Sequence, residues 1–165
     1  MRPAAANEYS IGSVVRYAPL IALVTGALLL IVAEFLDVRE IRAVTVVPPG
    51  GTTTGGDLHD YTLALIGVAL LPATYLALLR GARPAMTGLL VLSLLAVWVV
   101  FIVDRSALDD TGLIGERYDL AEAQPAFGYY VECVGAVLVL VGAVGALLLG
   151  PISRSQPASR EVNRP

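Results

Sequence analysis

Four long apolar stretches, separated by short polar segments, make up more than half of this 165-residue chain. A helix of about 20 residues, rising about 1.5 Å per residue, crosses a hydrocarbon layer of about 30 Å. The four stretches have that length and lie at residues 14–36, 61–79, 85–103 and 127–149. The sequence therefore predicts an all-α membrane protein, a bundle of four transmembrane helices forming one integral membrane domain over residues 1–165.

The composition supports this class. Hydrophobic residues make up 56% of the chain and charged residues 15%, with a mean hydropathy of +0.74, whereas soluble domains carry about 25% charged residues. All 11 basic residues are arginine, so Schiff-base lysine chemistry and lysine-containing phosphate loops are excluded. The net charge of -3 offers no basic surface for nucleic acid. We expect the lipid bilayer as the main partner, together with other membrane proteins or a second copy of the chain.

The arginines also predict the orientation, because arginines that flank a span resist translocation. The link at residues 80–84 contains two arginines and no acidic residue, which marks it as cytoplasmic. We therefore expect a bacterial plasma (inner) membrane protein with cytoplasmic tails at residues 1–13 and 150–165. The loops at residues 37–60 and 104–126 then face outward.

These two loops are long enough to form a small extracytoplasmic cap over the helix ends. Residues 38–47 are rich in β-branched side chains and precede Pro48, Pro49 and Gly50, which predicts a short β-strand followed by a turn. The glycine-rich run at residues 50–56 reads as a flexible turn. The second loop is acidic and includes Asp104, and acidic loops are usually solvated.

Small residues predict the faces on which the helices pack, because close van der Waals contact holds helices together in a bilayer. They recur every fourth position in the first two spans and every seventh position in the fourth. The predicted packing positions are Ala18, Ala22, Gly26, Ala69, Ala73, Ala77, Gly128, Gly135 and Gly142. Pro72 lies inside the second span and removes one backbone donor, so we expect a kink there.

Two carboxylates at membrane-edge positions are possible functional groups. Glu132 falls on the glycine-lined side of the fourth span, and ionisable groups within a span suggest function or pairing. It is either an interfacial carboxylate paired with Arg39, Arg42, Arg105 or His59, or a group that holds a ligand or proton. Glu34 lies near the outer end of the first span at a similar level, and the sequence leaves open whether the two carboxylates converge.

His59 and Cys133 are the single histidine and the single cysteine of the chain. His59 stands between Asp57 and Asp60 just before the second span, as a solvated or salt-bridged loop residue that could titrate on the outer face. One histidine and one cysteine cannot supply the clustered nitrogen and sulfur ligands of a zinc site. We therefore expect no metal, no cofactor and no catalytic residues.

Two motifs carry a resemblance. Residues 56–61, Gly-Asp-Leu-His-Asp-Tyr, and residues 127–132, Phe-Gly-Tyr-Tyr-Val-Glu, resemble those of uncharacterised four-span membrane proteins of GC-rich bacteria. In layout the chain is also similar to claudin-like tetraspan proteins, although it lacks their paired loop cysteines and tryptophan motif. The four-span layout is likewise similar to that of membrane proteins associated with tryptophan operons.

The sequence favours a non-enzymatic accessory, scaffold or assembly protein, because packing features are plentiful and catalytic groups are sparse. The alternative is a small transporter or channel subunit that uses Glu132 and the kink at Pro72. A pathway needs polar groups at mid-membrane depth, and there the spans offer mainly Thr25, Thr74 and Ser93. A membrane enzyme acting on lipid or quinone is the weakest interpretation, since no pair of nucleophile and base is visible.

Overall fold

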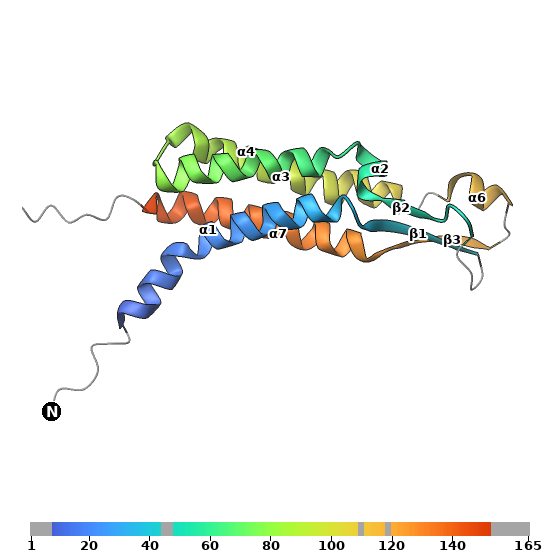
Figure 1. Ribbon diagram of the computed structural model, residues 1–165, viewed down its shortest axis with the longest axis horizontal. Coiled ribbons are helices and arrows are strands. Elements are labelled where there is room, and N and C mark those ends of the chain that lie inside the picture. The colour runs from blue at the N-terminus through green and yellow to red at the C-terminus, as the bar shows by residue number, and fades with distance from the viewer. Residues whose placement is uncertain (1–7, 44–47, 109–110, 118–119, 153–165) are drawn as a thin grey trace, which may run out of the picture.

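The protein is a bundle of four long helices with a small antiparallel sheet at one end, as the computed structural model shows (Figure 1). The structure describes residues 8–43, 48–108, 111–117 and 120–152. Four helical segments in these ranges are long and apolar enough to cross a membrane: Val15–Ala33, Thr62–Leu79, Arg83–Ala107 and Phe127–Leu149. The predicted fold class is confirmed, and the chain is a multi-pass membrane protein.

Two of the spans are continuous α-helices and two change their winding. The first is α1 (Glu8–Ala33) and the fourth is α7 (Phe127–Leu149). The second begins as α3 (Thr62–Thr74) and continues as the π-helix η1 (Tyr75–Leu79). The third consists of α4 (Arg83–Trp98), the π-helix η2 (Val99–Asp104) and the short α5 (Arg105–Ala107). The third span therefore extends past residue 103, where the apolar stretch ends.

The four spans form a closed ring in which α1 lies against α7 and α3, and α4 lies against the same two helices. Their buried core is aliphatic, with Leu23, Leu30, Leu70 and Leu89 fully enclosed. Gly135, Gly142 and Gly145 of α7 face α1, and a Cβ on Gly142 would lie 3.0 Å from the backbone nitrogen of Leu23. The hydrogen atoms of glycine therefore set how closely these two helices approach.

The predicted small-residue positions do not all lie inside the bundle. Gly26, Ala77, Gly128, Gly135 and Gly142 are buried, whereas Ala22 and Ala73 are half-buried and Ala18 and Ala69 are exposed. The α1–α7 interface thus uses Gly26 of α1 together with Gly135 and Gly142 of α7, whereas Gly128 packs against residues 37–38. The exposed alanines remain on the outer surface of the bundle.

The outside of the bundle is strongly apolar. Large aliphatic side chains such as Ile21, Leu65 and Val141 are more than half exposed, as expected for helices surrounded by lipid. Exposed aromatic side chains lie near the ends of the spans, Trp98 and Tyr130 near the sheet and Tyr17 and Tyr75 near the other end. This arrangement is typical of aromatic belts at the two membrane interfaces.

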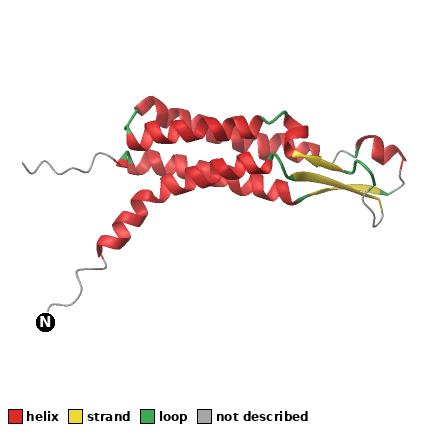
Figure 2. Cartoon of the chain, viewed as in Figure 1, coloured by secondary structure: helices red, strands yellow, loops and turns green. Residues whose placement is uncertain are grey.

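The cap contains a three-stranded antiparallel sheet in the order β2–β1–β3 (Figure 2). Its strands are β1 (Asp37–Ala43), β2 (Thr52–Thr54) and β3 (Ala121–Pro125). The central strand β1 pairs Glu40 with Thr52 on one side and with Gln124 on the other. The predicted strand at residues 38–47 is thus present up to Ala43, and residues 44–47 lie outside the described residues.

Two short helices complete the cap, α2 (Gly55–His59) and α6 (Gly112–Arg117). The glycine-rich run at residues 50–56 is more ordered than the expected flexible turn. Gly50 lies in the turn with a φ of +78°, but the threonines that follow form β2 because β-branched residues favour strands. Thr54 then caps α2 by accepting a hydrogen bond from the Asp57 backbone N–H, at 3.2 Å.

Candidate functional site

Four ionisable side chains from four segments meet where the bundle joins the cap. They are Glu34, His59, Asp104 and Glu132, here called the His59 cluster. The three carboxylate residues are each at most 1% exposed, and the His59 side chain is 8% exposed. Such groups are rarely buried without partners, so the cluster is the candidate functional site of the described chain.

Glu34 follows the last residue of α1 and connects the first span to the second. Its Oε1 accepts hydrogen bonds from the backbone N–H groups of Leu63, at 2.6 Å, and Ala64, at 3.1 Å. These donors belong to the first turn of α3, where backbone N–H groups lack helical partners and a negative charge is favoured. Glu34 thus caps α3, which leaves its Oε2 free to face His59.

His59 is the last residue of α2 and lies between two carboxylates. Its Nδ1 is 3.5 Å from Oε2 of Glu34, and its Nε2 is 2.8 Å from Oδ1 of Asp104. Asp60 follows in the left-handed conformation with a φ of 51°, which ends α2. The sequence predicted that His59 is either solvated or salt-bridged. In the structure its side chain is salt-bridged and almost fully buried.

Asp104 closes the π-helix η2 near the cap end of the third span. Only 1% of the residue is exposed, which corrects its assignment to a solvated acidic loop. The physical reason is that the third span continues to Ala107, so Asp104 lies on a helix that packs against α7. Single π-helical turns are frequent at functional sites, and η2 brings this carboxylate to His59.

Glu132 projects from the second turn of α7 and is fully buried. Neither of its carboxylate oxygens has a hydrogen-bond partner among the described residues. Two of the three arginines considered as partners make other contacts: Arg42 pairs with Glu40 at 2.6 Å, and Arg39 donates to the carbonyl of Ala107 at 3.0 Å. His59 is a predicted partner that the structure does bring to Glu132, since ligand atoms of the two side chains lie within 4.8 Å of one another.

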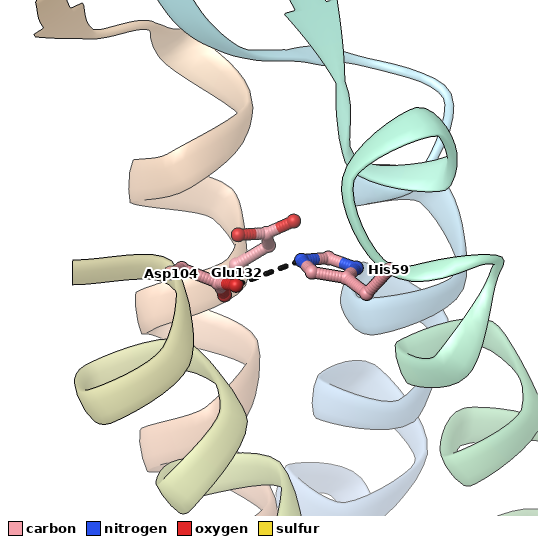
Figure 3. A group of neighbouring side chains, drawn as sticks. All are labelled: His59, Asp104 and Glu132. Atoms are coloured by element: carbon pink, nitrogen blue, oxygen red, sulfur yellow. Dashed lines mark ion pairs between the residues drawn. The ribbon is translucent and has the colours of Figure 1, made fainter. Parts of the chain in front are cut away.

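Figure 3 shows how His59, Asp104 and Glu132 point toward one another from three separate segments. One nitrogen or oxygen atom from each lies within 4.8 Å of the corresponding atoms of the other two. Glu34 completes the arrangement beside Gly55. A Cβ on Gly55 would lie 2.9 Å from Oε1 of Glu132 and 3.2 Å from Oε2 of Glu34. The question left open by the sequence is thus answered, since the two carboxylates approach the same glycine.

The carboxylates around His59 favour its protonated, positively charged form. Burial of His59 disfavours its protonated form, but the contacts with Asp104 and Glu34 outweigh burial and raise the pKa of His59 to about 10. The histidine is therefore protonated at neutral pH when nothing else occupies the cluster. Three carboxylates still face this one cation, and uncompensated buried charge is costly.

Sequence reasoning found three of the four members and missed Asp104. Its signal was present, since Asp104 directly follows the apolar stretch at residues 85–103 in the same way that Glu34 follows α1. An acidic residue beside a span is equally consistent with a solvated loop end, and only its position on a packed helix distinguishes the two. Chemically, the assembled cluster can hold a proton, or it can hold a cation through one imidazole nitrogen and several carboxylate oxygens.

Comparison of the chain with models of protein families finds no match, and comparisons with curated proteins and with solved structures find none either. The described residues show a multi-pass membrane protein with a buried His59 cluster.

Proposed function

We propose that this protein is a non-enzymatic accessory or assembly partner of other proteins in a bacterial plasma membrane, with both termini in the cytoplasm. The ends of the first and fourth spans that lie away from the cap are at the same end of the bundle (Figure 1), which is consistent with this orientation. The cap would then face the outside.

The observation that carries the proposal is a hollow on the lipid-facing side of α1 and α7. It has a volume of about 320 Å³ and is lined by Ala18, Ile21, Ala22, Thr25 and Leu138. Ala18 is exposed and Ala22 half-exposed, so neither side chain is fully buried between helices of the bundle. Exposed small residues allow a further transmembrane helix to approach closely, and this hollow is where we expect a partner helix.

Polar groups at mid-span support the accessory role over transport. Thr74 donates to the carbonyl of Leu70 at 2.7 Å, and Ser93 donates to the carbonyl of Val139 at 3.1 Å. Both hydroxyls are buried and satisfied by helix backbone, and Thr25 faces the outer hollow. These three groups therefore do not line up as a polar path through the single bundle.

A photo-crosslinking residue at position 18 tests this role in native membranes. We expect capture of a defined membrane protein, or of a second copy, at Ala18. Capture should be absent at Leu65, which is 68% exposed on α3 and serves as the matched control. Filling the hollow with Ala22→Leu should abolish the crosslink. Capture of lipid alone at both positions, or normal assembly of every captured protein after deletion of the gene, would contradict the proposal.

The second candidate function is a small transporter or channel subunit, and the His59 cluster is the observation that favours it. Buried ionisable residues within spans often mark ion or proton paths. Reconstitution into liposomes with a pH gradient and a pH-sensitive dye tests this function. Proton flux that exceeds protein-free liposomes and is lost in Glu132→Gln would support it, and equal background rates for both proteins would exclude proton transport by the isolated chain.

A further inference from the structure

We propose that His59, Asp104 and Glu132 form a binding site for one divalent transition-metal ion, with Zn²⁺ as the best-fitting example, and that Glu34 positions His59 for it. This inference does not depend on the accessory role or on transport, because it concerns only the side chains of the His59 cluster.

The geometry is close to that of a small metal site. Zinc binds histidine nitrogen and carboxylate oxygen at about 2.0–2.2 Å, so donors around one tetrahedral ion lie about 3.4 Å apart. The three donor atoms already lie within 4.8 Å of one another, and Nε2 of His59 is 2.8 Å from Oδ1 of Asp104. Small side-chain rotations would bring all three to one ion without moving the helices.

The arrangement of His59 supports the same conclusion. A histidine that binds metal through one ring nitrogen usually donates the other N–H to a carboxylate, which fixes the orientation of the ring. The Nε2 atom of His59 faces Asp104 in the cluster, whereas its Nδ1 faces Oε2 of Glu34. Glu34 is itself held by the backbone N–H groups of Leu63 and Ala64. The carboxylate that would orient a metal-binding histidine is therefore present and fixed in place.

Glu132 is the independent observation that points to a ligand. It is fully buried, its carboxylate lies beside the His59 ring (Figure 3), and one of its oxygens lies within 4.8 Å of ligand atoms of His59 and Asp104. Neither oxygen has a hydrogen-bond partner among the described residues. Buried carboxylates in folded proteins are normally paired, hydrogen-bonded or bound to metal. A cation between Glu132, Asp104 and His59 would give the Glu132 oxygens the partner that they lack among the described residues.

Charge and donor type select the kind of cation. Three carboxyl groups surround the single imidazole, and a divalent ion would offset the negative charge that they carry when ionised. Imidazole nitrogen suits zinc and neighbouring transition metals, whereas calcium requires six to eight oxygen ligands and magnesium keeps most of its water. The sequence argument against zinc considered only nitrogen and sulfur donors, and it left out the carboxylates that the fold brings to His59.

The test uses the full chain, purified in detergent with an affinity tag that contains no histidine and stripped of metal with a chelator. Binding of Zn²⁺ is measured by competition with a chromophoric chelator, and metal content is measured by elemental analysis. We expect one Zn²⁺ per chain and a thermal unfolding temperature that rises with Zn²⁺ but not with Mg²⁺. Affinity should fall at least about tenfold in His59→Gln, Asp104→Asn and Glu132→Gln. Glu34→Gln, a change in the carboxylate behind the histidine, should lower it about 10- to 100-fold.

The control variant is Glu116→Gln, which removes an exposed carboxylate from α6 and should leave Zn²⁺ affinity unchanged. Circular dichroism and gel filtration of each metal-free variant show whether it is folded. The proposal is overturned if the folded wild-type chain binds no Zn²⁺, or if the cluster variants bind it as tightly as Glu116→Gln does. If Asp104→Asn does not fold, Glu132→Gln decides the result, because that substitution breaks no hydrogen bond among the described residues.

Discussion

Glu34 holds the N-terminus of α3 with one carboxylate oxygen and faces Nδ1 of His59, at 3.5 Å, with the other. The same side chain therefore fixes the start of the second span and the orientation of the histidine just before it. Because Asp104 contacts the opposite ring nitrogen, the His59 cluster connects the end of α1, the start of α3 and the end of the third span. Any occupant of the cluster would consequently affect how the cap is joined to the bundle.

The stability of the metal-free protein should depend on pH through His59. Its folded pKa of about 10 lies above the ordinary value of about 6.5, since the Glu34 and Asp104 carboxylates outweigh the effect of burial. The stabilisation is then fully present below about pH 6.5 and is lost as the pH rises through about 10. We expect the free energy of unfolding to fall by at least about 1 kcal/mol between pH 7 and 10.5. Denaturation in mixed detergent micelles measures this change.

The control for this pH dependence is His59→Gln, because other groups also titrate at alkaline pH. The difference between the two proteins isolates the contribution of His59, which faces Glu34, Asp104 and Glu132. An identical decrease in both proteins would show that His59 does not cause it.

Glu132→Gln should have opposite effects with and without metal. In the metal-free protein we expect stability to stay equal or to rise, because the amide keeps this buried position neutral and the substitution breaks no hydrogen bond among the described residues. With Zn²⁺ present, the wild-type chain should gain stability and the variant should not. Thermal unfolding with and without chelator measures both effects, and a variant that is less stable than wild type without metal would refute this explanation of Glu132.

Gly55→Ala should disturb the cluster from the cap side. Its new Cβ would lie 2.9 Å from Oε1 of Glu132 and 3.0 Å from the Cα atom of Glu34, and the second contact is with backbone that cannot swing away. We expect a loss of about 1–3 kcal/mol of stability from overpacking, together with weaker Zn²⁺ binding. Gly88→Ala is the control, because a Cβ there has no atom within 4 Å and alanine favours a helix by about 1 kcal/mol. Equal behaviour of the two variants would argue against close packing at Gly55.

Gly26→Ala should separate α1 from α7. The added Cβ would lie 2.9 Å from the carbonyl oxygen of Gly135 and 2.9 Å from the backbone nitrogen of Val139. Since both contacts are with backbone, the helices must move apart. We expect the free energy of unfolding to fall by about 1–3 kcal/mol. Ala69→Val is the control, because Ala69 is exposed on α3 and added methyl groups meet only lipid. Unchanged resistance of Gly26→Ala to denaturing detergent would refute the close approach of α1 and α7.

Much of the fold follows from local sequence. Helices in lipid must satisfy their own backbone hydrogen bonds, so an apolar run of sufficient length has few alternatives to a spanning helix. The strand before Pro48 followed from its β-branched residues, and β1 is present up to Ala43. The extent of the third span did not follow, because it continues as η2 and α5 through Asp104 to Ala107. A charged residue at a helix end is buried, as Asp104 is, only where other segments surround it.

The sequence by itself determined the number of spans, their approximate ends and the sheet-forming first loop, because these depend on the hydropathy and conformational preferences of neighbouring residues. It also identified Glu34, His59 and Glu132 as residues of interest. Only the tertiary structure decided that these three meet Asp104 in one buried cluster. That outcome depends on the winding of η2, the cap that Glu34 provides for α3 and the position of α2 beside Gly55. Contacts between segments far apart in the chain leave no periodic pattern in sequence, so the site became visible only when the helices were packed.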